Sequence, residues 1–196
     1  LAVVGDRLHL HRVGERRRVE DFTCADANAS CLVGVGRADA LQRGADAIVS
    51  QGKGRKAKNA DFYANLEAKY GVPAGVLIAI HGMETGFGGF MGDTNVVSAI
   101  ATLTYDCRRS DFFRPHLLGA LKMVDKGMIS AKTVGAKHGE LGHTQFLPGN
   151  AYSYGVDGNG DGAVDLYNQA DALATTANYL RKKGWKPGKG YQEGEP

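Results

Sequence analysis

Glu84 is the residue best suited to acid–base chemistry, because it ends an apolar stretch and glycines follow it, in IAIHGMETGFGG at residues 78–89. It lies four residues after Ile80 and seven after Leu77, so on a helix it projects from the face that these two residues bury. Apolar neighbours disfavour the ionised carboxyl and raise its pKa, which lets a glutamate donate a proton near neutral pH. The alternative is a carboxylate that turns to solvent at the helix end or caps a backbone amide.

A second polar position, Gln145, stands between small and apolar residues in GELGHTQFLPG at residues 139–149. Its amide could line a sugar-binding cleft, or it could cap the proline turn that follows it. The aromatic residues Tyr152, Tyr154 and Tyr179 could stack on sugar faces, and core or edge positions are the alternative for them. We take Gln145, Tyr152 and Tyr179 as candidate substrate contacts.

The segment DGNGDGAVDLYN at residues 157–168 places oxygen side chains at alternating positions, as a calcium-binding EF-hand loop does. The matching side chains, at positions one, three, five and nine, are Asp157, Asn159, Asp161 and Asp165. Gly162 supplies the glycine of position six, whereas Asn168 replaces the bidentate glutamate of position twelve. The loop therefore holds either a structural calcium ion or an acidic turn closed by Asx hydrogen bonds.

The elements that must position these residues belong to a mainly α-helical chain, as apolar spacing and capping residues indicate. Helices are predicted over residues 38–50, 59–71, 73–86, 111–127 and 169–184. A basic, glycine-containing linker separates the first two, and Asn59 is the candidate cap of the second. Residues 1–36 show no sustained period and form an N-terminal segment without an assigned role.

Composition and charge describe an ordinary globular protein of 196 residues with a net charge of +3. No aromatic-interleaved basic motif indicates nucleic-acid binding, and no apolar run approaches the roughly 20 residues that span a bilayer. The cysteines Cys24, Cys31 and Cys107 lack zinc-ligand spacing. A disulfide between Cys24 and Cys31 would leave one odd thiol.

Three stretches, taken in order, resemble the lytic murein transglycosylase B family. They are YGVPAGVLIAIHGMETGFGGFMGDTNVVSAIATLTYDCRRSDFF, then GELGHTQFLP, then YGVDGNGDGAVDLYNQADALATTANYL. The resemblance spans about residues 37–190. It implies a lysozyme-like, mainly helical catalytic domain over residues 37–196, with an EF-hand-like loop insertion, that acts on the glycan strands of bacterial peptidoglycan.

The resemblance also assigns roles to individual residues. The glutamate of the family pattern GxETxxG falls on Glu84, as the single catalytic acid and base, and the glutamine of GxxQFxP falls on Gln145, as a substrate contact. The family's calcium loop falls on Asp157, Asn159, Asp161 and Asp165, with a backbone carbonyl from Ala163. The expected product is a 1,6-anhydro-muramic acid end, formed without a catalytic cofactor. Glu140 and His143, near the cleft, could tune the pKa of Glu84 or contact peptide, and surface placement is the alternative.

Two other functions remain open at this stage. A muramidase would use Asp93 or Glu140 as a second carboxylate and release reducing ends. A catalytically weak peptidoglycan-binding domain would release no fragments. Relatives continue with a further helix that closes the cleft, so the domain is expected to be truncated at its C-terminus. The resemblance implies a monomer in the periplasm or cell envelope of a Gram-negative bacterium.

Overall fold

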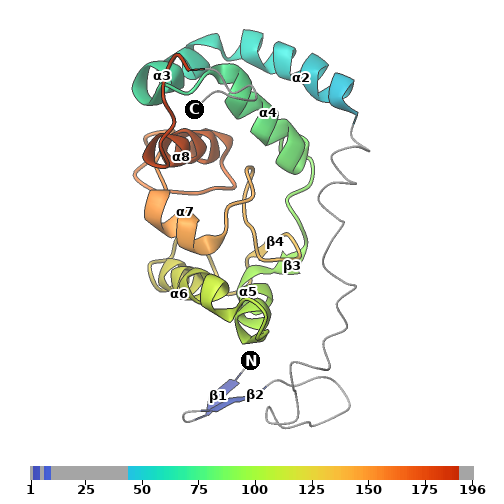
Figure 1. Ribbon diagram of the computed structural model, residues 1–196, viewed down its shortest axis with the longest axis vertical. Helices are drawn as coiled ribbons and strands as arrows, with labels where there is room; N and C mark the ends of the chain where they lie inside the picture. The colour runs from blue at the N-terminus through green and yellow to red at the C-terminus, as the bar shows by residue number, and fades with distance from the viewer. Residues whose placement is uncertain (1, 5–6, 10–43, 190–196) are drawn as a thin grey trace.

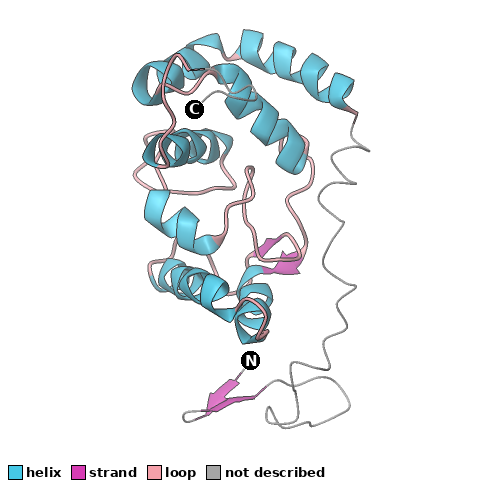
Figure 2. Cartoon of the chain, in the orientation of Figure 1, coloured by secondary structure: helices cyan, strands magenta, loops and turns pink. Residues whose placement is uncertain are grey.

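The computed structural model describes residues 2–4, 7–9 and 44–189, and this part of the chain is mainly helical (Figure 1). Its helices are α2 (Ala45–Lys58), α3 (Ala60–Tyr70), α4 (Ala74–Thr85), α5 (Val96–Tyr105), α6 (Ser110–Asp125), α7 (Pro148–Tyr154) and α8 (Gln169–Lys182). Its strands pair antiparallel, β1 (Ala2–Val4) with β2 (Arg7–His9) and β3 (Thr94–Asn95) with β4 (Val134–Gly135). Figure 2 shows how small the strand content is, which confirms the predicted mainly helical class. Within these residues no helix is both long and apolar enough to cross a membrane.

The N-terminal segment predicted over residues 1–36 lies mostly outside the described residues, as do Cys24 and Cys31. Only its two short strands, β1 and β2, are described. Cys107 is disulfide-bonded, so it is not the odd thiol that a Cys24–Cys31 pair would have left.

The junction between α2 and α3 differs from the prediction. The basic stretch 51–58, expected as a linker, continues α2. Gly52 lies where α2 meets α4, because a Cβ on it would come within 2.6 Å of the Ile78 side chain. Asn59 does not cap α3 with its side chain, and its Nδ2 instead donates to the backbone oxygen of Arg55 at 3.0 Å. The glycine that indicated a linker therefore serves a close helix–helix contact.

Helix α8 lies between α3 and α4 on one side and α7 on the other (Figure 1), and it contributes residues to two hydrophobic clusters. The first joins α3, α4 and α8, and its fully buried members include Tyr63, Leu77 and Leu173. The second joins α5, α6, α7 and α8 with the chain segment 139–147, and its members include Val96, Met123 and Leu141. The segment 139–147 is thus anchored in the second cluster.

Candidate active site

Glu84 lies in the last turn of α4, which ends at the left-handed Gly86. The buried face of this helix consists of Ala74, Leu77, Ile78, His81, Gly82 and Thr85. At about 100° per residue, Glu84 falls at the edge of that face, and it is exposed. The predicted burial of Glu84 is therefore wrong, and the carboxyl lies where solvent or a ligand can reach it.

The neighbouring Thr85 fastens the end of α4 to the segment 139–147. Thr85 is buried, and its hydroxyl donates to the backbone oxygen of His143 at 2.7 Å. The hydroxyl oxygen of Thr85 in turn accepts from the backbone N–H of Gly88 at 2.9 Å. Since Thr85 directly follows Glu84, these bonds fix the backbone that carries the candidate acid.

Gln145 lies in a tight bend whose two sides, Leu141 and Phe146, exchange backbone hydrogen bonds of 2.9 and 3.0 Å. Its φ of 52° lies in the left-handed region, which a residue other than glycine rarely adopts. The side-chain Nε2 donates to the backbone oxygens of Gly142 at 2.8 Å and Met91 at 3.4 Å. Among the described residues Oε1 accepts no hydrogen bond, so Gln145 both closes the bend and keeps one acceptor for a ligand.

The sequence did not predict that His81 and His143, which lie close to Thr85, form a hydrogen-bonded pair. His81 Nε2 and His143 Nδ1 are 2.9 Å apart, and His143 Nε2 lies 3.1 Å from the backbone oxygen of Tyr167. A carbonyl only accepts, so His143 donates through Nε2, and its Nδ1 then accepts from His81 Nε2. This leaves His81 Nδ1 unprotonated, buried and without a partner among the described residues.

Burial sets the protonation of this pair. Burial, followed in importance by the nearby His143 and Arg55, lowers the pKa of His81 to about 4. Burial also lowers the pKa of His143. Both rings are therefore neutral at neutral pH, which matches the hydrogen-bond pattern. The available sequence signal was a histidine on the apolar face of α4.

The rings of the two candidate sugar-stacking tyrosines, Tyr152 and Tyr179, have different partners in the structure. The Tyr179 ring packs edge to face against Phe146 at 5.4 Å between centroids, and against Tyr154 at 5.1 Å. Tyr179 is therefore next to the bend that carries Gln145. The ring of Tyr152 instead lies beneath the ammonium groups of Lys122 on α6 and of Lys126 just after it, 5.6 and 5.1 Å from the ring centroid. We find no contact that joins Tyr152 to Glu84 or Gln145 among the described residues.

The candidate calcium loop lies between α7 and α8 and is closed by its own hydrogen bonds. The Asp157 carboxylate accepts from the backbone N–H groups of Gly160 at 2.6 Å and Gly162 at 2.8 Å. Asp161 accepts from the Asn159 side chain at 2.8 Å. These contacts are the Asx bonds of the alternative interpretation. Each carboxylate oxygen keeps a further lone pair, so the donor chemistry still fits a hard cation.

Asp171, which sequence reasoning missed, holds this loop to α8. It is fully buried, and its carboxylate accepts from the backbone N–H groups of Gly158, Asn159 and Asp165 at 2.9, 3.2 and 2.8 Å. In the described part of the chain, no group of three or more His, Cys, Asp or Glu side chains is arranged to hold a metal ion. Any ion would therefore rely on amide and backbone oxygens as well.

The two carboxylates considered for a muramidase occupy different surroundings. Asp93 is exposed, in the chain that leads from α4 to β3, and its Oδ1 accepts from Thr94 at 3.4 Å. Glu140 is half-buried before the bend of Gln145, with Oε1 3.7 Å from His138 Nδ1. Neither carboxylate has a described contact with Glu84.

Comparison with known proteins gives consistent matches. The model of the transglycosylase SLT domain family matches residues 40–194. The membrane-bound lytic murein transglycosylase B of Escherichia coli (strain K12) is 36% identical over 121 residues, which are 61% of this chain and 34% of that protein.

Solved structures match over most of the chain. The E. coli lytic transglycosylase Slt35 in complex with calcium is 30% identical with a TM-score of 0.71, over 80% of this chain and 51% of that one. SltB3 from Pseudomonas aeruginosa in complex with NAG-anhNAM-pentapeptide is 38% identical with a TM-score of 0.69, over 79% and 42%. The chain thus spans about a third of the curated relative and about half of these structures.

Proposed function

Because this chain belongs to the transglycosylase SLT domain family, we propose that it is a lytic transglycosylase that cleaves the glycan strands of peptidoglycan. Family membership confirms the resemblance found in the sequence, and the solved lytic transglycosylases confirm the lysozyme-like helical fold. The catalytic domain in this proposal is residues 37–196. The reaction takes place where peptidoglycan is, in the cell envelope or periplasm, and the E. coli relative is itself membrane-bound.

In this proposal Glu84 is the single catalytic acid and base, and Gln145 contacts the substrate. The observation that carries it is the bond from the Thr85 hydroxyl to the backbone oxygen of His143, supported by the bond from the Gln145 amide to Met91. These bonds hold the end of α4 against the bend of Gln145. The Glu84 carboxyl and the Gln145 Oε1 are therefore carried by neighbouring segments and can contact the same ligand. Tyr179, packed on Phe146 beside that bend, is the aromatic that supports sugar binding best.

The chemistry needs only one carboxyl. A glycan strand lying over the end of α4 would exclude water from the exposed Glu84 and favour its neutral form. Glu84 would then donate its proton to the glycosidic oxygen between MurNAc and GlcNAc as the bond from C1 to that oxygen breaks. The oxygen of the substrate's own N-acetyl group would stabilise the cation that develops at C1.

The second half of the reaction returns the proton. The Glu84 carboxylate would take the proton of the muramoyl O6 hydroxyl, whose oxygen forms the new bond to C1 and closes the 1,6-anhydro ring. No water is consumed, and Glu84 ends in its starting form. The presence of an anhydro sugar in the SltB3 complex supports this product.

Mass spectrometry of the soluble fragments released from purified peptidoglycan tests the proposal. We expect anhydro-ended fragments, one water lighter than hydrolytic products, from the parent chain and from the control Glu67→Gln, an exposed glutamate on α3. Glu84→Gln should release none. Reducing ends would instead favour a muramidase with Asp93 or Glu140 as second carboxylate. No fragments from the parent would favour a binding domain.

We also propose a structural calcium ion in the 157–168 loop. Its ligands would be the side chains of Asp157, Asn159, Asp161 and Asp165 and the backbone carbonyl of Ala163. The oxygen donors of this loop and the calcium in the Slt35 complex support it. The ion would connect α7 to α8, and no step of the reaction passes through it.

A further inference from the structure

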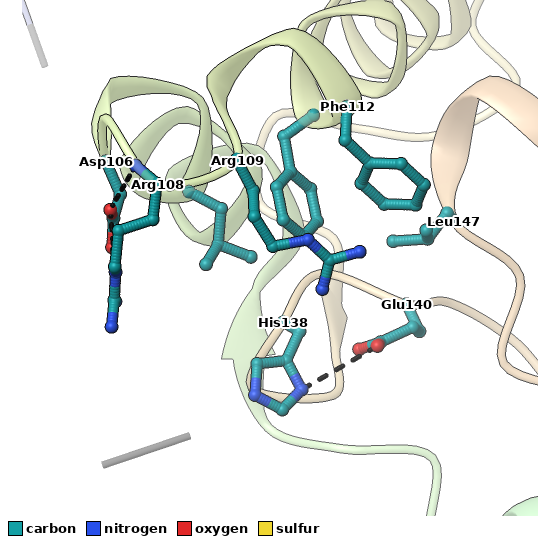
Figure 3. A pocket seen from close by; sticks show the side chains of 9 residues that line it. Asp106, Arg108, Arg109, Phe112, His138, Glu140 and Leu147 are labelled. Atoms are coloured by element: carbon teal, nitrogen blue, oxygen red, sulfur yellow. Dashed lines mark hydrogen bonds and ion pairs between the residues drawn. The ribbon is translucent and has the colours of Figure 1, made fainter. Parts of the chain in front are cut away.

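A pocket of about 450 Å³ lies between the start of α6 and the chain that leads into the bend of Gln145 (Figure 3). Its lining includes the apolar Phe112, Phe113 and Leu147 and the polar or charged Arg109, His138 and Glu140. This size and mixture are typical of small-ligand sites, which combine apolar walls with a few polar groups. The glycan chemistry proposed above leaves the pocket without a role.

Arg109 gives the pocket an uncommitted positive charge. Its guanidinium lies over the rings of Phe112 and Phe113, 4.5 and 5.4 Å from their centroids. The neighbouring Arg108 is neutralised by Asp106, whose two carboxylate oxygens each lie 3.0 Å from Arg108 Nε. Arg109, in contrast, has no carboxylate partner among the described residues. The aromatic rings hold its planar guanidinium group, which can bind a carboxylate through two hydrogen bonds.

Glu140 gives the same pocket an uncommitted negative charge. Its Oε2 is buried and accepts no hydrogen bond from the described residues. Its Oε1 lies 3.7 Å from His138 Nδ1, which is beyond a good hydrogen bond. The half-buried Glu140 carboxylate thus lines the pocket with neither oxygen bonded to a donor at good distance, which is rare in folded proteins and favours a donor supplied by a ligand in the pocket.

The two charged groups point into the pocket without pairing with each other (Figure 3). A ligand with a single charge would satisfy one of them and leave the other desolvated. A ligand that carries a carboxylate and an ammonium on one carbon would satisfy both. We propose that this pocket binds the free amino-acid end of a peptidoglycan stem peptide, with its carboxylate on Arg109 and its ammonium on Glu140.

The pocket lies close enough to the proposed glycan site for a stem peptide to reach it. This assignment of the pocket to a stem peptide rests on the proposed function. Glu140 and Gln145 are five residues apart and belong to a chain that folds back on itself, so their Cα atoms are less than about 18 Å apart. A stem peptide of five residues reaches a similar distance when extended. The solved SltB3 complex contains a pentapeptide attached to its sugars. A diamino acid within a stem carries the required ammonium and carboxylate at the end of its side chain, where no neighbouring residue blocks them.

Calorimetric titration with synthetic peptides tests the pocket without glycan. The first probe is an acetylated stem tripeptide whose diamino acid keeps its free ammonium and carboxylate. In the second probe this ammonium is acetylated, and in the third this carboxylate is amidated. The parent should bind the first probe about ten- to a hundredfold more tightly than either of the others, as expected for the loss of a charged hydrogen bond.

The variants assign each charge to its residue. Arg109→Ala should lose the preference for the free carboxylate and keep that for the ammonium, whereas Glu140→Gln should do the reverse. Arg114→Ala is the matched control, because Arg114 lies on α6 close to Arg109, is largely exposed and does not line the pocket. It should bind all three probes as the parent does.

The outcomes separate this proposal from the proposed function. A parent that releases anhydro fragments but binds the three peptides equally overturns the pocket proposal and leaves the function in place. A parent that discriminates among the peptides and loses this in Arg109→Ala and Glu140→Gln supports the pocket, whether or not it releases fragments. Free D-alanine that binds as tightly as the first probe would overturn the assignment to stem peptides.

Discussion

Acidification should destabilise this protein through the buried His81, which is paired with the half-buried His143. His81 is 0% exposed, and its Nδ1 has no partner among the described residues. A proton added there would place an uncompensated charge in the core beside a second ring. The unfolded chain accepts the same proton in water without this cost, so acid favours unfolding.

The size of the effect follows from the pKa of His81, which burial and, to a smaller extent, His143 and Arg55 lower from 6.5 to about 4. Because the folded pKa lies below the unfolded one, the stabilisation is present above about pH 6.5 and is lost as the pH falls toward 4. The complete shift corresponds to about 3 kcal/mol. Between pH 7 and pH 5 the free energy of unfolding should fall by about 2 kcal/mol from His81 alone.

Urea unfolding of the parent and of His81→Leu at both pH values measures this contribution. The variant removes the titrating group and the unpartnered Nδ1, so its free energy of unfolding should fall by about 2 kcal/mol less than that of the parent. His138→Gln, at a half-exposed histidine outside the core, should behave as the parent does. Equal losses in the parent and in His81→Leu would refute the assignment of the acid sensitivity to this pair.

Four further substitutions test other parts of the fold and the candidate ion. Asp171→Ala leaves three backbone N–H groups without their acceptor and should cost about 3 kcal/mol or more in urea unfolding, and an unchanged stability would contradict its anchoring role. Gly92→Ala should cost at least about 2 kcal/mol, because φ is 96° and the new Cβ would lie 2.0 Å from the Gly135 oxygen. Gly127→Ala, with a φ of 70° and nothing within 4 Å, should cost less, and equal costs would exclude the clash as the cause. A calcium chelator should lower the Tm of the parent but not of Asp157→Ala, and a parent Tm that ignores both calcium and chelator would defeat the ion proposal.

Helices with clear periodicity and end signals were predictable from the sequence. The predicted ranges for α3, α4, α6 and α8 agree with the structure to within two residues at each end. Left-handed glycines, Gly71 and Gly86, mark two of these ends. Local signals of this kind act within a few residues, so one sequence carries them completely.

Helix α5 was missed because its local signals conflict. Its sequence VVSAIATLTY is rich in β-branched residues, which favour strands. The Asn95 side chain nevertheless accepts from the Ser98 N–H and starts a helix. Val96 and Ile100 are fully buried on one face of it. Burial against α6 therefore overrides the intrinsic preference, and such a contact between elements cannot be read from the segment alone.

The candidate site likewise combines features that short motifs predict with features that depend on contacts between distant residues. The positions of Glu84 and Gln145 came from short motifs, but the pairing of His81 with His143 joins residues 62 apart in sequence. The pocket similarly brings Arg109, which directly precedes α6, to the chain that carries Glu140. Contacts of this range depend on how the helices pack, which no local spacing encodes.

The exposure of Glu84 also has a physical explanation. A carboxylate buried in the free protein would have to pay for its lost hydration, so it would either destabilise the fold or be neutral before substrate arrives. This fold instead buries the neutral, hydrogen-bonded Thr85 and His81 beside it, with the half-buried His143 bonded to both, and these groups hold the backbone of α4. The carboxyl then stays accessible at the edge of the helix. In this arrangement, positioning comes from the buried neighbours, and the desolvation that a general acid needs comes from the substrate that covers it.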